Sequence, residues 1–109
     1  MADAKELDEL KALYPDAQEI TENGQEYIYL PTLKLPEGCL PALVEGLLCA
    51  HGRDGYATRL FLSAPVVGKG NNWTQHHIAN RTWHTWSWKD VSASQRLVQI
   101  LLGHLDAFK

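Results

Sequence analysis

The chain has 109 residues, which is enough for one domain but not comfortably for two, so a single domain over residues 1–109 is expected. Hydrophobic residues make up 45% of the chain and charged residues 21%, and the formal net charge is −3. This balance argues against nonspecific nucleic-acid binding, which needs a basic face, and no apolar run approaches the roughly 20 residues that span a bilayer.

Residues 3–13 predict a short amphipathic helix. Asp3 and Glu6 have the spacing of a capping box, and Leu7, Leu10 and Leu13 form one apolar stripe. The helix should end at Tyr14-Pro15, because the residue before a proline is pushed out of the helical region. This acidic start does not have the basic-then-apolar pattern of a signal peptide.

The two cysteines, Cys39 and Cys49, resemble neither a disulfide framework nor a metal knuckle. They are expected to be free thiols in a reducing compartment. Together with the missing signal pattern, this predicts a cytoplasmic protein.

Residues 17–35 predict a β-hairpin, since Asn23-Gly24 is a strong type I′ turn signal between β-forming residues. Pro31 and Pro36 interrupt its second strand, which is therefore expected to be irregular or at a sheet edge. Two further strands are expected downstream. Residues 40–50 are apolar but contain proline and glycine, and residues 59–64 form a short apolar run that Pro65 closes.

Residues 72–89 are rich in indole and imidazole. The stretch holds all four tryptophans and three of the five histidines of the chain: Trp73, His76, His77, Trp83, His84, Trp86 and Trp88. Its periodicity is weak, so a flap is expected that either packs over the domain or presents a contact surface. If residues 83–88 are extended, Trp86 and Trp88 share one face with His84, and Trp83 points to the other.

Residues 92–108 predict the C-terminal helix, with Ser92 and Gln95 as a capping box and leucines at helical spacing. The order of elements is helix, three to four strands, aromatic flap, helix. It predicts an α+β fold in which the terminal helices pack on a small antiparallel meander.

Several segments resemble a known family. The helix, Leu13-Tyr14-Pro15 and the meander resemble RWD domains, which are relatives of ubiquitin-conjugating (UBC) enzymes. Residues 29–38 (YLPTLKLPEG) are similar to the "lPxxxLPpG" segment of the prokaryotic ubiquitin-conjugating-like family E. Gly55-Tyr56 with residues 60–62 is similar to its "GYP…mFwv" strand, and residues 83–88 (WHTWSW) to its "WqrWSrH" segment. The resemblance covers residues 27–108.

The resemblance implies a UBC/RWD-like fold and a role in bacterial ubiquitin-like modification. The implied partners are an adenylating (ThiF-like) enzyme, a ubiquitin-like modifier and a JAB-type metallopeptidase. The chain departs from the family where Trp88-Lys89 replaces a histidine and Ala57 replaces a proline. It also has no cysteine after Cys49, where conjugating enzymes carry their nucleophile. A noncatalytic RWD-like interaction adaptor is therefore the alternative function.

Catalysis of thioester transfer would need an accessible thiolate. Cys39 lies in a proline-flanked loop and is expected to be exposed. Cys49 lies in an apolar run and is expected to be buried and inert, although His51 would offer it a Cys-His arrangement. If the protein carries a thioester, one of these two must be the nucleophile. For a hydrolytic reaction, His84 is the candidate general base.

Binding is the other role open to the aromatic stretch. Tryptophan is enriched at interface hot spots, so its tryptophans and histidines are candidate contact residues, with core packing as the alternative. His76, His77 and His84 could also bind zinc, but their spacing is not that of a known knuckle. No metal or other cofactor is therefore expected, and a metal-dependent hydrolase is the weaker alternative. Gly68-Lys69-Gly70 lacks the pattern of a phosphate-binding loop.

Overall fold

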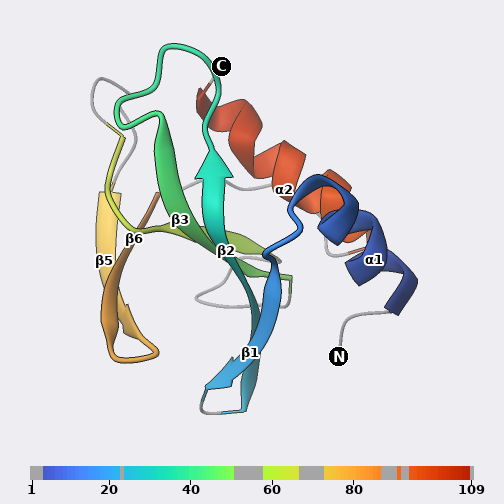
Figure 1. Ribbon diagram of the computed structural model, residues 1–109. Helices are drawn as coiled ribbons and strands as arrows, with labels where there is room; N and C mark the ends of the chain where they lie inside the picture. Colours follow the sequence, from blue (N-terminus) through green and yellow to red (C-terminus); the bar gives the residue numbers. More distant parts are fainter. Residues whose placement is uncertain are drawn as a thin grey trace.

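The computed structural model describes residues 4–22, 24–50, 58–66, 73–86, 91 and 94–108. In this part of the chain, two α-helices and a short 3-10 turn accompany one six-stranded antiparallel sheet (Figure 1). The elements are α1 (Ala4–Leu13), β1 (Gln18–Glu22), β2 (Gln25–Lys34), β3 (Leu43–Cys49), β4 (Arg59–Leu62), β5 (Trp73–Ile78), β6 (Arg81–Trp86), α2 (Leu97–Leu105) and η1 (Asp106–Phe108). The strand order is β1-β2-β3-β4-β6-β5. The predicted α+β class is confirmed, but the prediction of three to four strands is wrong.

The predicted N-terminal hairpin is confirmed. Glu22 pairs with Gln25, and Gly24 has a φ of 77°, the left-handed backbone that a type I′ turn requires. Pro31 lies within β2, where the register with β3 shifts between Leu30 and Leu33. The shift takes the proline out of the regular ladder, as a bulge does, so the strand is irregular as expected. It is not an edge strand, because β1 covers its other side.

The apolar run at 40–50 is a strand, β3, as predicted. A Cβ at Gly46 would lie 2.7 Å from Leu33 Cδ2, so a larger residue at this position would force the Leu33 side chain to shift. The glycine lets the shifted part of β2 pack closely against β3. β4 then pairs antiparallel with β3, with Leu47 opposite Phe61.

The expected flap is wrong, because the described part of the aromatic stretch forms two sheet strands. β5 and β6 are joined by Ala79 and Asn80, both with positive φ, and pair continuously from Trp73↔Trp86 to Ile78↔Arg81. Aromatic residues face both sides of this hairpin, so the sequence lacks the simple apolar–polar alternation that marks a strand. The predicted split is confirmed for Trp86 and Trp83, which belong to opposite sides of the sheet.

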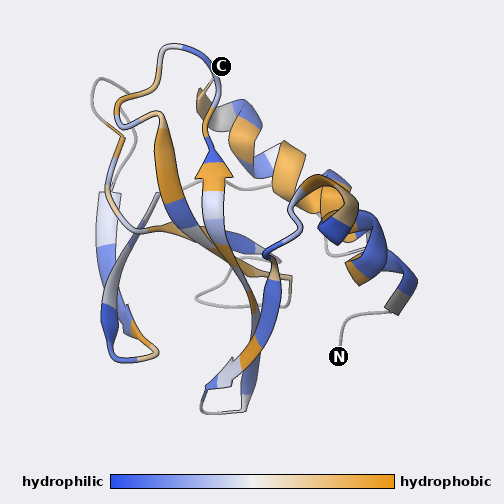
Figure 2. Cartoon of the chain, in the orientation of Figure 1, coloured by the Kyte–Doolittle hydropathy of each residue, from blue (hydrophilic) through white to orange (hydrophobic). Residues whose placement is uncertain are grey.

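The sheet carries a hydrophobic core on each face. The larger core lies between the sheet and the helices and includes Leu30, Leu48, Leu60, Trp86 and Leu101. Hydrophobic residues make up much of α2, which lies against the sheet (Figure 2). The smaller core lies on the opposite side, called here the open face, and consists of Tyr27, Leu47, Cys49, Phe61, Ile78 and Trp83.

The sheet curls toward the open face. The rings of Tyr29 on β2 and Trp83 on β6 are 6.4 Å apart, although β3 and β4 lie between their strands. At the hairpin tips, the backbone N–H of Ala79 donates to the carboxylate of Glu22. The curl brings side chains from β2, β3 and β6 together, and it thereby creates the site described below.

The C-terminal helix begins later than predicted, at Leu97, so the proposed capping box of Ser92 and Gln95 is wrong; Ser92 itself lies outside the described residues. Gln99 instead accepts a hydrogen bond from the N–H of Arg96 at 3.2 Å. The carboxylate of Glu6 on α1 accepts from the N–H of Leu97 at 3.1 Å, so α1 caps α2. Neither described helix is long and apolar enough to cross a membrane.

Candidate functional site

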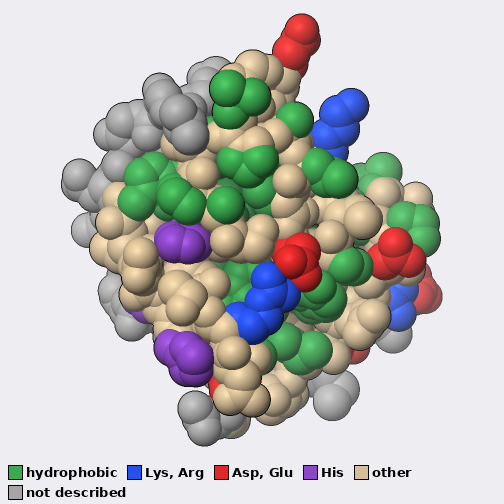
Figure 3. Space-filling view, turned by 60° about the vertical axis from the view of Figure 1, so that its left-hand side comes forward, with side chains coloured by type: hydrophobic (Ala, Val, Ile, Leu, Met, Phe, Trp, Pro, Cys, Tyr) green, Lys and Arg blue, Asp and Glu red, His purple; other side chains and the backbone are tan. Residues whose placement is uncertain are grey.

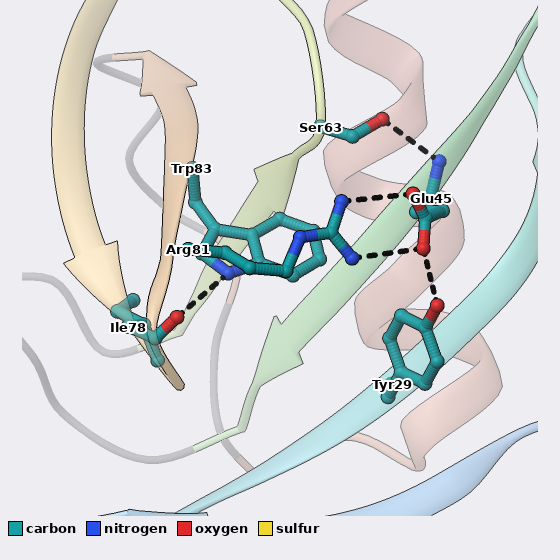
Figure 4. Close-up of polar contacts among 6 residues, drawn as sticks. All are labelled: Tyr29, Glu45, Ser63, Ile78, Arg81 and Trp83. Carbon is teal, nitrogen blue, oxygen red and sulfur yellow. Dashed lines mark hydrogen bonds and ion pairs between the residues drawn. The ribbon is translucent and has the colours of Figure 1, made fainter.

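A polar cluster of Tyr29, Glu45 and Arg81, called here the polar centre, occupies the open face (Figure 4). The two terminal guanidinium nitrogens of Arg81, Nη1 and Nη2, donate to the two oxygens of the Glu45 carboxylate, at 2.9 and 2.8 Å. The Tyr29 hydroxyl donates to the same carboxylate. The three residues come from β6, β3 and β2, so the arrangement depends on the curled sheet.

The polar centre stays charged at neutral pH. The Arg81 guanidinium first, and the Tyr29 hydroxyl second, hold the pKa of Glu45 at about 2. The hydrogen bond that Tyr29 donates to this carboxylate raises the pKa of Tyr29. The side chains of Arg81 and Glu45 are 42% and 35% exposed, so water screens their attraction and both charges reach the surface.

The polar centre packs on two aromatic rings, those of Trp83 and Phe61, called here the aromatic floor. The guanidinium carbon of Arg81 is 4.7 Å from the centre of the Trp83 ring, a cation–π contact. Trp83 is in turn fixed by donating from Nε1 to the carbonyl of Ile78 at 3.1 Å. Phe61 extends the floor and meets the ring of His76 edge to face at 5.4 Å. The side of the molecule that carries β5 and β6 accordingly shows adjoining basic and acidic groups among hydrophobic side chains, with histidines nearby (Figure 3).

Both candidate nucleophiles are buried. Cys39 is 2% exposed and Cys49 is 0% exposed. The expected exposure of Cys39 is therefore wrong: after Gly38, which has a φ of 91°, the thiol turns inward and lies 3.9 Å from the carbonyl oxygen of Phe108. The expected burial of Cys49 is confirmed; its sulfur accepts a hydrogen bond from Gln25 Nε2 at 3.2 Å.

Among the described residues, no histidine pairs with the thiol of Cys49. His84 is half-buried on β6, where it pairs with Gln75 and Leu62 on the helix side of the sheet. Cys49 belongs to the core of the open face. The residue proposed to accompany Cys49 in sequence, His51, lies outside the described residues.

The candidate binding residues divide by burial. Trp83 and Trp86 are 1% and 2% exposed, so both pack in the interior and do not present a contact surface. Each fills one of the two cores. Trp73 is half-buried and stacks on Phe108, with ring centres 6.1 Å apart. Of the other candidates, His76 is half-buried, His77 is exposed and Trp88 lies outside the described residues.

The three histidines proposed as zinc ligands do not converge. His76 pairs with Trp83 and lies on the open face. Side chains alternate along a strand, so its neighbours Gln75 and His77 lie on the helix side of the sheet, and so does His84, which pairs with Gln75. Within the described ranges, no group of three or more His, Cys, Asp or Glu side chains is placed to hold a metal ion.

The sequence analysis did not identify a buried histidine, His104. His104 on α2 is 1% exposed and lies 2.9 Å, Nε2 to Oγ1, from Thr58, whose hydroxyl donates to the carbonyl of Val91 at 2.7 Å. The hydroxyl has one proton, which it gives to Val91, so it can only act as an acceptor toward His104. His104 must therefore donate from Nε2, which fixes the Nε2–H tautomer. Burial, followed by the positive charge of Arg59, lowers the pKa of His104 from 6.5 to about 4. Its position in the apolar stripe of the helix was the available signal.

The polar centre was also missed by sequence reasoning. Glu45 is the one charged residue in the run from 40 to 50, and a lone carboxylate in an apolar strand needs a partner. That partner, Arg81, lies on β6, within the stretch that was expected to be a flap. Comparison with known protein families, with curated proteins and with solved structures finds no match to this chain.

Proposed function

We propose that the chain is a ubiquitin-conjugating-like (UBC/RWD-like) domain of a bacterial ubiquitin-like modification pathway that acts by noncovalent docking. The N-terminal helix, the antiparallel strands β1 to β4 and the C-terminal helix support the proposal, whereas β5 and β6 extend the sheet where the resemblance implies a flap. The burial of both thiols carries the noncatalytic form of the proposal, because thioester transfer needs a thiolate that a modifier can reach. The partners are the adenylating enzyme or the ubiquitin-like modifier, with a JAB-type metallopeptidase as a third candidate.

The docking surface of this proposal is the polar centre with the adjoining His76. Arginine and tyrosine are enriched among the residues that dominate binding energy at interfaces. Arg81 is held in place by Glu45 and by the Trp83 ring, so little side-chain entropy is lost when a partner binds. Adjacent charges of both signs suit a partner that presents a complementary pair.

An RWD-like adaptor outside such a pathway would use the same surface. The two functions differ in their partners and not in their chemistry. Binding measurements with the pathway's own proteins therefore distinguish them.

The test combines a covalent and a noncovalent measurement. The chain is incubated with its adenylating enzyme, the modifier and ATP, and no adduct sensitive to thiols is expected on a nonreducing gel. Isothermal titration calorimetry with each protein should detect binding to at least one of them. Arg81→Ala should weaken that binding about tenfold or more, whereas Lys11→Ala, an exposed charge on α1, should not change it.

Two results would overturn the proposal. A thiol-sensitive adduct that disappears in Cys39→Ser or Cys49→Ser would restore a catalytic role. Absence of binding to every one of the pathway proteins would remove the function itself.

A further inference from the structure

The hydrogen bonds inside the polar centre leave it with more open donors than open acceptors. Oε1 of Glu45 accepts from Arg81 Nη1 and from the Tyr29 hydroxyl, and Oε2 accepts from Arg81 Nη2. A carboxylate has about four acceptor positions, so most of those on Glu45 are already used. The guanidinium keeps further N–H groups besides the two that Glu45 takes. A partner therefore meets a surface that mainly donates hydrogen bonds.

The open donors of Arg81 form a fork. Besides the end-on pair of Nη1 and Nη2, a guanidinium has a side-on pair of N–H groups on Nε and Nη2, which matches a planar carboxylate. Tyr29 lies at the Nη1 end, because its hydroxyl and Nη1 share one oxygen of Glu45. No described residue accepts a hydrogen bond from Nε, and the Arg81 side chain is 42% exposed. The side-on fork is therefore open to a ligand.

Ser63 adds a donor beside this fork. Its Oγ accepts from the backbone N–H of Glu45 at 3.0 Å, so the hydroxyl proton is left for another acceptor. Ser63 and Tyr29 lie on opposite sides of the guanidinium, with Ser63 on the side of Nη2 (Figure 4). Glu45 and the Trp83 ring hold the guanidinium in place, so the fork is preorganised for binding.

We propose that the Nε–Nη2 fork of Arg81 and the Ser63 hydroxyl bind the carboxylate of an aspartate or glutamate side chain on the docking partner. This inference rests on the proposed docking function and names the chemistry that the same surface recognises. One oxygen of the partner's carboxylate accepts from Nε and the other from Nη2, as in bidentate arginine–carboxylate pairs. The Ser63 hydroxyl donates to the oxygen at Nη2.

Charge and geometry favour a carboxylate over other acceptors. A backbone carbonyl has one oxygen and no net charge, so it gains less from the fork. A phosphate group brings about two negative charges, whereas Arg81 is the one cation of the polar centre and Glu45 already offsets it. A carboxylate in the fork lies about 4 Å from the guanidinium and about twice as far from the Glu45 carboxylate, so attraction exceeds repulsion.

NMR titration of the full isotope-labelled chain with three blocked peptides tests the proposal. The peptides are Ac-Gly-Leu-Glu-Leu-Gly-NH2 and its counterparts with glutamine or phosphoserine at the central position. The glutamate peptide should shift the signals of the Arg81 Nε–H and the Ser63 amide. Its dissociation constant should be lower than that of the glutamine peptide by about fivefold or more.

Arg96 is the internal control. It is a more exposed arginine, at 62%, and is likewise ion-paired, with Glu9 at 3.4 Å. If an exposed guanidinium were sufficient, the glutamate peptide would shift the Arg96 side chain as much as that of Arg81. The proposal predicts a much smaller shift at Arg96.

Two variants separate the fork from its charge. Arg81→Lys keeps the positive charge but has no fork, and it should weaken binding of the glutamate peptide about fivefold or more, whereas Arg96→Lys should not change it. Ser63→Ala removes the flanking donor and should weaken binding by a smaller factor. The comparison of peptides on the wild type tests the proposal even if a variant fails to fold.

Four results would each overturn the proposal: equal affinity for the glutamate and glutamine peptides, tighter binding of the phosphoserine peptide, equal shifts at Arg96, or no binding of any peptide. None of them touches the docking function, which calorimetry with the pathway proteins tests separately. A chain that binds the glutamate peptide but none of the pathway proteins would support the carboxylate site and remove the docking function.

Discussion

The buried histidine on α2 gives the sharpest pH dependence that this structure predicts. His104 is neutral in the folded protein because its pKa is lowered from 6.5 to about 4. A group with a depressed folded pKa favours folding above its unfolded pKa, and that contribution is lost as pH falls from about 6.5 toward 4. The unfolded chain takes up the proton in this range and the folded chain does not, so acid favours unfolding.

The magnitude follows from the two pKa values. Between about pH 7.5 and pH 5 the free energy of unfolding should fall by about 2 kcal/mol, and below pH 4 the loss should level off near 3 kcal/mol. For a domain of this size, 2 kcal/mol corresponds to a decrease in Tm of about 8 °C. Glu45 contributes little in this window, because its folded pKa is about 2 and its unfolded pKa is near 4.5.

The assay is urea unfolding at a series of pH values for the wild type and two variants. His104→Gln keeps a donor for the Thr58 hydroxyl but cannot take up a proton, so its stability should lose most of the slope between pH 7.5 and 5. His77→Gln removes an exposed histidine and should keep the wild-type slope. Equal slopes for the wild type and His104→Gln would refute the reasoning.

Three further predictions concern local contacts. Arg81→Ala should let the pKa of Glu45 rise from about 2 toward 4.5, and it should cost only about 1 kcal/mol of stability because the ion pair is partly exposed. NMR titration of the Glu45 carboxyl carbon measures the pKa, and an unchanged value would mean that Arg81 does not lower it. Gly46→Ala should cost about 1–3 kcal/mol in urea unfolding, since the added Cβ meets Leu33 at 2.7 Å, whereas wild-type stability would mean that Leu33 moves aside freely. Glu6→Ala should cost about 1 kcal/mol by removing the cap of α2, with the exposed Asp8→Ala as its control; equal effects of the two changes would argue against the cap.

The parts of the fold that the sequence predicted are those with local signals. Asn23-Gly24 marks the first hairpin, and Tyr14-Pro15 marks the end of α1. The second hairpin was missed, because Trp83 and Trp86 fill cores on opposite faces and thereby remove the alternation that identifies a strand. The start of α2 was misplaced, because its cap is the carboxylate of Glu6, about ninety residues away in sequence, and not a neighbouring serine.

The candidate site was harder to predict than the fold, for a related reason. The exposure of Cys39 depends on how the chain turns after Gly38 and packs against Phe108, a contact between distant segments. The polar centre likewise needs the sheet to curl before Arg81 can reach Glu45 across β4. Composition could suggest aromatic packing, but only the strand register decides which rings reach the surface.

The most direct test of the docking account is a chemical-shift map of the isotope-labelled chain, titrated in turn with the ubiquitin-like modifier and the adenylating enzyme. The largest shifts should occur at Tyr29, Glu45, His76 and Arg81 on the open face, with α1 and α2 little changed. Shifts confined to the two helices, with none on the open face, would contradict it.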